Sequence, residues 1–199
     1  MAAASDDAQE RADYACAEAT LLSAQGDHHG ALAAATRARD QGIRLGVWHY
    51  TVKEAVVLGV EAAIAAGDLR AAEDILEHVA ALPAGDRSRY LEIQVERLRA
   101  LMAWQRGELG EVASGLDSAI PGFRRLMLPF WTAITLLERS ELLASQGRVG
   151  ETAAELIEAR QIFRRLRAEP WLRRAARLDP DGTVTAAEHA AAVADADAR

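Results

Sequence analysis

The chain has 199 residues and a net charge of -7; half of its residues are apolar, and it contains one cysteine. This length suits one domain or one elongated repeat array. The negative charge argues against general nucleic-acid binding, which needs a basic surface, and the single cysteine excludes an intramolecular disulfide and predicts a reducing compartment. Alanine supplies much of the apolar content and β-branched runs are scarce, so we expect closely packed helices and no sheet.

The hydrophobic pattern predicts nine helices, with apolar residues at the 3.6-residue spacing of an amphipathic helix. In chain order their expected ranges are 8–25, 28–44, 49–66, 69–81, 87–106, 109–126, 130–146, 149–167 and 171–178. Pro83 and Pro129 separate consecutive helices, because the residue before a proline is disfavoured in the helical conformation. Pro121 falls inside an expected helix and should kink or shorten it.

Four glycines recur at intervals of 41, 40 and 40 residues: Gly26, Gly67, Gly107 and Gly147. A glycine adopts a left-handed cap conformation at little cost, so each should end one helix and lead into its antiparallel partner. The residue after each of the first three glycines is acidic and suits a helix start. Arg148 has the opposite charge, so the helix after Gly147 should start least well.

Other positions keep the same register, including the aromatic residues Tyr50, Tyr90, Phe130 and Trp171. One helical pair cannot cover its own apolar face, whereas stacked pairs bury a continuous core. We therefore expect an all-α, right-handed solenoid of about four helical hairpins with a C-terminal capping helix. The repeat domain should span 8–178, followed by an acidic, Ala-rich tail over 179–199 that is flexible or forms a short helix.

The repeat resembles the tetratricopeptide (TPR) family. The resemblance rests on the helix-ending glycine, on Ala31 and Ala72 five residues after it, and on a small residue at Ala38, Val79, Ala119 and Ala159. The forty-residue period exceeds the usual 34 and the early Trp and Tyr signature of the first helix is absent. Both features look like the longer TPR-like arrays in the C-terminal parts of bacterial signalling ATPases, such as LuxR-type regulators of the maltose-regulator kind and cyclase-linked ATPases.

By this resemblance, the first helix of each pair lines a concave groove that binds a protein or peptide. Counting back from the glycines selects the expected contact residues Glu54, Glu61, Gln94, Arg97, Leu101, Trp104, Leu137 and Glu141. Trp104, beside Arg97 and Leu101, is the best candidate anchor, because Trp and Arg dominate interface energetics. The alternative is that Trp104 packs under the neighbouring repeat.

A second candidate surface lies near the C-terminus, where seven arginines occur between Arg160 and Arg177 with Glu169 as the only acid. Arginine binds carboxylates or phosphates in a forked geometry, so a basic patch for an acidic partner is one interpretation. Its proposed members are Arg164, Arg165, Arg167, Arg173 and Arg174. The other interpretation is a solvated helical cap.

No metal or cofactor is expected. The five histidines are scattered, and His28 and His29 point about 100° apart on a helix. The stretch "DPDGTVTAAE" places Asp179, Asp181 and Glu188 at ligand positions of an EF-hand loop, but Arg177 stands where the first carboxylate belongs. The competing interpretation is a turn followed by a capping box on a last short helix.

The chain has no glycine-rich phosphate loop, no serine-nucleophile motif and no zinc-protease motif, so we expect no enzymatic activity. It also shows no apolar run long enough for a membrane span and no signal peptide, which predicts a cytoplasmic protein. The preferred hypothesis is a non-catalytic protein-interaction or regulatory module; one form of this hypothesis makes the chain a detached or truncated C-terminal part of a bacterial signalling ATPase or transcriptional regulator. The alternative is a sensor that binds a small effector in the groove or between repeats.

Overall fold

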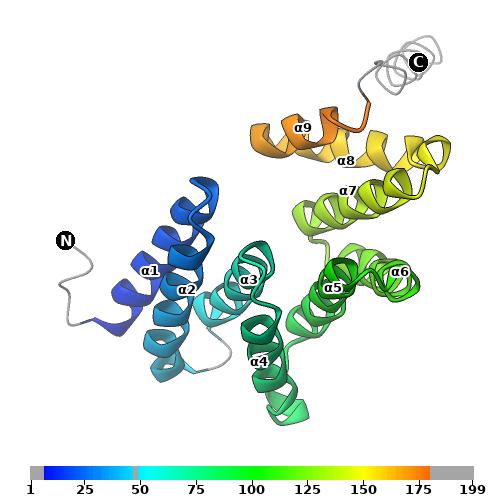
Figure 1. Ribbon diagram of the computed structural model, residues 1–199. Helices are drawn as coiled ribbons and strands as arrows, with labels where there is room; N and C mark the ends of the chain where they lie inside the picture. The colour runs from blue at the N-terminus through cyan, green and yellow to red at the C-terminus, as the bar shows by residue number, and fades with distance from the viewer. Residues whose placement is uncertain (1–6, 47–48, 180–199) are drawn as a thin grey trace. The chain divides into compact units, whose positions relative to one another are not determined.

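The computed structural model describes residues 7–46 and 49–179, and every regular element in these ranges is helical (Figure 1). The α-helices of this part of the chain are α1 Ala8–Ala24, α2 His28–Gly42, α3 Tyr50–Ala65, α4 Leu69–Ala80, α5 Arg89–Arg106, α6 Leu109–Arg125, α7 Pro129–Ser145, α8 Ala153–Leu166 and α9 Glu169–Ala176. Short 3₁₀ turns occur at Ile43–Leu45, Ala84–Asp86 and Val149–Glu151. The all-α prediction is confirmed.

The chain groups into two compact units, Met1–Gly107 and Glu108–Arg199. The boundary falls at the third periodic glycine, between α5 and α6, inside the single repeat domain that the sequence predicted. In the first unit, α1 packs against α2, and α3 packs against both of them and against α4 and α5. In the second unit, α7 packs between α6 and α8, and α9 packs on α8.

The periodic glycines adopt the left-handed conformation that the sequence predicted. Their φ angles are 82° at Gly26, 76° at Gly67, 79° at Gly107 and 74° at Gly147. The acidic residues after the first two glycines cap the next helix. Asp27 accepts a hydrogen bond from the Gly30 amide, and Asp68 accepts one from the Ala71 amide. These side chains satisfy amide donors that the first helical turn leaves without partners.

The helix after Gly147 begins later than the predicted position 149. A weak helix start at this place was expected from Arg148. A 3₁₀ turn occupies Val149–Glu151, and α8 begins only at Ala153. Arg148 cannot accept hydrogen bonds from the first amides of a helix; its guanidinium binds both carboxylate oxygens of Glu151 at 2.7 Å. The predicted start at residue 149 is therefore wrong by about one turn.

Helix α6 continues through Pro121 to Arg125, so the expectation that this proline shortens the helix is also wrong. Proline removes one backbone donor from the helix interior. Ile120 and Phe123, on either side of it, are both buried, and their packing holds the last turn in place.

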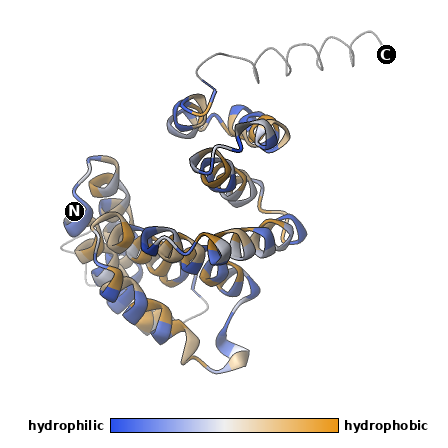
Figure 2. Cartoon of the chain, turned by 45° about the vertical axis from the view of Figure 1, so that its right-hand side comes forward, coloured by the Kyte–Doolittle hydropathy of each residue, from blue (hydrophilic) through white to orange (hydrophobic). Residues whose placement is uncertain are grey.

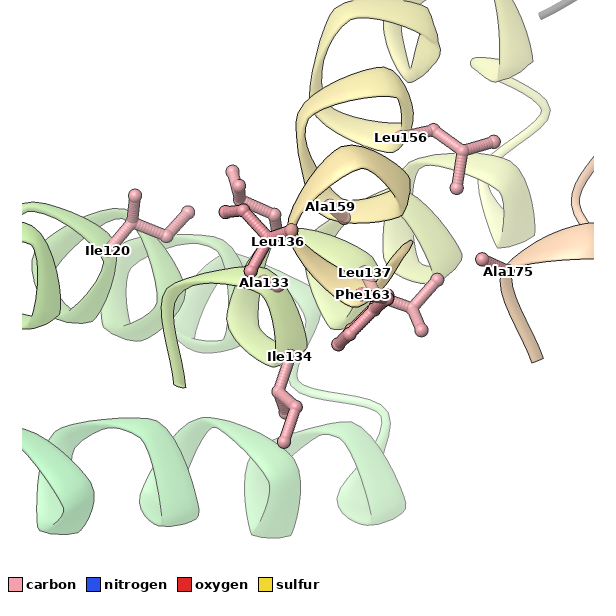
Figure 3. Close-up of a cluster of buried hydrophobic side chains, with 10 residues drawn as sticks. Ile120, Ala133, Ile134, Leu136, Leu137, Leu156, Ala159, Phe163 and Ala175 are labelled. Atoms are coloured by element: carbon pink, nitrogen blue, oxygen red, sulfur yellow. The ribbon is translucent and has the colours of Figure 1, made fainter. Parts of the chain in front are cut away.

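The contact among α1, α2 and α3 is rich in alanine, whereas α3, α4 and α5 also bury larger residues such as Val57, Leu76 and Leu98. In the first unit α1, α2 and α3 meet through alanines, and one buried cluster consists of Ala15, Ala38 and Ala55. The second unit has a larger cluster around Leu137, Leu156 and Phe163 (Figure 3). Most helices carry polar and apolar residues together, as amphipathic packing requires (Figure 2). Among the described residues, no helix combines the length and apolarity needed to cross a bilayer.

Candidate functional site

The helices that end at the four periodic glycines, α1, α3, α5 and α7, are called the first helices below. In the first unit, polar side chains link each first helix to the next one along the chain. Asp13 of α1 accepts hydrogen bonds at one carboxylate oxygen, from the Tyr50 hydroxyl at 2.9 Å and from the Thr51 hydroxyl at 2.6 Å. Both donors belong to the first turn of α3, so the contact fixes the start of α3 against α1.

The link between α3 and α5 repeats this arrangement one period later. The Tyr90 hydroxyl donates to Glu54 at 2.9 Å and accepts a hydrogen bond from the Gln94 side-chain amide at 3.1 Å. Arg97 then donates to the Gln94 side-chain oxygen at 3.2 Å and to Glu61 at 2.8 Å. Glu54, Tyr90, Gln94, Arg97 and Glu61 thus form one continuous network, which we call the α3–α5 network.

A comparable ion pair joins first helix α7 to the terminal helix α9 in the second unit. Arg174 donates to both carboxylate oxygens of Glu141 at 2.6 Å, and its guanidinium carbon lies 5.3 Å from the ring centre of Trp171. Glu141 occupies the same place relative to Gly147 as Glu61 does relative to Gly67. In both units, an arginine from the second helix along the chain therefore binds the glutamate six residues before the periodic glycine.

Burial controls the electrostatics of the α3–α5 network. Burial raises the pKa of Glu54, the hydrogen bond from Tyr90 opposes this shift, and the charge of Glu61 adds to it. Burial, together with the charge of Glu54, also raises the pKa of Tyr90, so that its hydroxyl stays protonated and can donate. The pKa of the nearby Cys16 thiol rises to about 11, mainly through burial and further through Glu54 and Asp13. Cys16 is therefore a weak nucleophile at neutral pH.

The residues predicted to line a groove are largely engaged within the chain. Gln94, Arg97 and Leu137 are buried, with Arg97 only 1% exposed. Glu54, Glu61 and Glu141 accept the hydrogen bonds described above. Of the predicted set, Leu101 and Trp104 of α5 remain half-exposed without a role in these links. The expected pairing of Arg97 with Trp104 as a surface anchor is not what the structure has, because the Arg97 guanidinium turns toward Glu61 of α3.

The predicted basic patch is also divided. Arg165, Arg167 and Arg173 are exposed, as is Arg164, which has an interaction within the chain. Arg174 is bound by Glu141 and stacked on Trp171, so its charge is already compensated. Four arginines of the predicted patch are therefore open to solvent, and Arg174 is not among them.

Asp179, the third position of the suggested EF-hand loop, is engaged within the chain. Asp179, assigned to the tail by sequence, is buried and accepts a hydrogen bond from Arg160 at 3.0 Å. This ion pair extends the folded part of the chain to residue 179 and removes one carboxylate from the suggested calcium loop. Asp181, Gly182 and Glu188 lie outside the described residues. Within the part of the chain that the structure describes, no three His, Cys, Asp or Glu side chains are placed to hold a metal ion together.

The structure also has a surface depression that the sequence pattern did not predict. An open depression of about 420 Å³ lies between α2 and α4, which follow the first two periodic glycines. Leu32, Ile43 and Ile75 supply its apolar lining, and Arg39 and Asp74 are among its charged residues. Two helices that are not consecutive in the chain line this depression, so the sequence pattern did not predict it. One local indication of an apolar surface was Ile43, which is exposed just beyond the end of α2. We call this depression the α2–α4 cleft.

No model of a known protein family matches this sequence, and no curated protein is similar enough to it to count as a relative.

Proposed function

We propose that this protein is a non-catalytic interaction module built from TPR-like helical hairpins stacked in a right-handed solenoid, and that it regulates a larger bacterial signalling assembly in the cytoplasm. The observation that carries the proposal is a pair of exposed apolar side chains on one side of α1, with Glu18 between them in an ion pair with Arg37 of α2. Tyr14 and Leu21, seven residues apart on one side of this helix, are 45% and 57% exposed.

The repeat register supports a helix as the partner of this face. Counted from the periodic glycines, Tyr14 corresponds to Ala55 of α3, and Leu21 corresponds to Ala62. Both alanines are only 2% exposed, and Ala55 packs in a cluster with alanines of α1 and α2. In α3, Ala55 is therefore part of the surface through which one helical pair stacks on the pair before it, and Ala62, two turns further along, is buried as well. The same positions in α1 present a stacking surface of the same kind to solvent.

The groove that the TPR resemblance implies remains part of the proposal. Its available residues are Leu101 and Trp104 of α5, which are half-exposed. A Trp with one face open to solvent is a common anchor of protein interfaces, because it buries a large area at a small entropic cost. The face of α1 is the more specific candidate, because equivalent positions elsewhere in the chain already pack against helices.

A second candidate function is the sensing of a small effector. It is favoured by the α2–α4 cleft, because its volume of about 420 Å³ lies within the range of roughly 300–1,000 Å³ usual for ligand sites. The cleft uses the second helices of two pairs, whereas the interaction hypothesis uses the face of α1, so separate variants can test the two functions.

The test is capture of proteins from an extract of the source organism on immobilised protein, followed by quantitative mass spectrometry. We expect Leu21→Glu to reduce retention of the specific partner at least tenfold. Leu166→Glu is the matched control, because Leu166 is also a leucine of similar exposure, 46%, and lies in the other unit. Trp104→Ala tests the groove. Retention that is equal for wild type and the Leu21 and Trp104 variants would contradict the proposal.

A further inference from the structure

Arg87 differs from the other poorly exposed arginines of the chain. It lies between the 3₁₀ turn Ala84–Asp86 and α5, its side chain is half-buried, and among the described residues no group accepts a hydrogen bond from its buried Nε. The comparable arginines are each held by a carboxylate at 2.6–3.0 Å: Arg97, Arg139, Arg160 and Arg174. A buried donor without an acceptor costs about 1–3 kcal/mol, so a chain rich in acids would be expected to pair it.

Arg87 lines a small cavity that adjoins the α2–α4 cleft. The cavity has a volume of about 20 Å³, room for one water-sized group, and its wall includes Val52, Val56 and Leu91. Arg39 lines the same cavity. The carboxylate bound to Arg39 is that of the adjacent Asp40, which is mostly exposed and 3.2 Å away.

The formal charge of the lining residues differs between the small cavity and the α2–α4 cleft. Arg39 and Arg87 face the small cavity together with one carboxylate, Asp86, which gives a formal charge of +1. The outer α2–α4 cleft contains Arg39 with two carboxylates, Asp40 and Asp74, which gives -1. One anionic group is therefore favoured in the small cavity, and a second anionic group is disfavoured in the α2–α4 cleft.

The cleft and the cavity share Arg39, Ile43 and His78, so one ligand can extend from one into the other. The α2–α4 cleft has an apolar part of its wall, formed by Leu32, Ile43 and Ile75. An aliphatic group there would lose contact with water, which is favourable in proportion to the apolar area buried.

From these observations we propose that the α2–α4 cleft binds a small amphiphile with one carboxylate on an aliphatic body. One carboxylate oxygen enters the small cavity and accepts a hydrogen bond from Arg87 Nε, and the guanidinium of Arg39 adds a second favourable charge. The aliphatic body lies between α2 and α4 against Ile43 and Ile75. Hydrogen bonds between guanidinium and carboxylate are about twice as strong as neutral ones, which suits recognition at a partly buried site. This proposal is independent of the function assigned to the face of α1.

The test uses three probes with the same carbon chain, namely octanoate, octanol and octylammonium; the two ionic probes are kept below their micelle concentrations and octanol below its solubility limit. Dissociation constants are measured by isothermal titration calorimetry on the full chain. We expect octanoate to bind at least tenfold more tightly than octanol, a difference of about 1.4 kcal/mol, and octylammonium to bind more weakly than octanol. Arg87→Met, which keeps an unbranched stem as far as the position of Nε but removes the guanidinium, should abolish the preference for octanoate. Arg99→Met, at an exposed arginine of α5 outside the cleft, should retain it.

Two further readouts keep the result interpretable. Arg87→Met should melt no lower than wild type, because it removes an unpartnered buried donor, and octanoate should raise the melting temperature of wild type but not of this variant. Methyl NMR signals of Ile43 and Ile75 should shift on addition of octanoate. Equal binding of octanoate and octanol, no effect of Arg87→Met on binding, or shifts confined to other methyl groups would each overturn the proposal.

Discussion

Replacement of the periodic glycines by alanine should destabilise the protein, whereas the same change three residues further along should not. At Gly67 and Gly107, φ is 76° and 79°, and an added Cβ would meet no other atom within 4 Å. The cost therefore comes from the backbone alone, roughly 1–2 kcal/mol for an alanine in the left-handed region. The reduced freedom of the unfolded chain offsets roughly 0.4–1 kcal/mol of this, so the net loss should be about 1 kcal/mol.

Gly110 provides the matched control. It lies in the first turn of α6, its φ is not positive, and a Cβ there also meets nothing within 4 Å. Gly110→Ala should therefore stabilise the protein by about 0.5–1 kcal/mol, which separates it from Gly107→Ala by about 2 kcal/mol. The assay is urea unfolding followed by far-ultraviolet circular dichroism. If the two substitutions change the free energy of unfolding by the same amount, the cap assignment is refuted.

Three other predictions concern the α3–α5 network and the nearby Cys16. Arg97→Met should lower the free energy of unfolding by about 3 kcal/mol because it removes a donor from the buried Gln94 and the partly buried Glu61, whereas Arg106→Met, which breaks the exposed pair with Glu73, should cost no more than about 1 kcal/mol in the same urea assay. The folded-state pKa of Glu54 is raised, so the folded state binds a proton more tightly than the unfolded state. The free energy of unfolding of wild type should therefore rise relative to that of Glu54→Gln as the pH falls from neutrality toward about pH 5. If urea unfolding gives the same difference in stability between the two proteins at both pH values, this prediction is wrong. With its pKa at about 11, roughly one Cys16 thiol in a thousand is ionised near pH 8. Alkylation of Cys16 by iodoacetamide, measured by mass spectrometry, should therefore be more than tenfold slower than alkylation of free cysteine. In urea, where the chain is unfolded, the two rates should be equal.

The sequence predicted the helices well because their signals are local. Eight of the nine helices begin and end within two residues of the expected positions, and the glycine caps have the expected conformation. The one larger difference, at the start of α8, has a local cause, and the shift of two residues in α9 has another. Arg148 binds Glu151 and leaves a 3₁₀ turn in place of the first turn of α8, and α9 begins at Glu169, with Pro170 in its first turn.

The candidate site was harder to predict because it depends on contacts between helices. The register placed Glu61 and Arg97 on related faces of successive first helices, but it could not show that Arg97 reaches back 36 residues to bind Glu61. The α2–α4 cleft has the same origin, since its lining comes from two helices that are not consecutive in the chain. Periodicity assigns a side chain to a face of its helix, whereas partners are set by the approach of neighbouring helices.

The central claim, that α1 presents a stacking surface for a partner helix, is tested most directly by site-specific photo-crosslinking in cells. A benzoylphenylalanine residue introduced at Leu21 would be compared with one at Leu166, which has similar exposure. The account predicts that position 21 forms a crosslink to one protein, that the linked peptide belongs to an apolar helical segment, and that Tyr14→Glu in the same chain abolishes the crosslink. Equal crosslinking at the two positions, or none at position 21, would contradict the account.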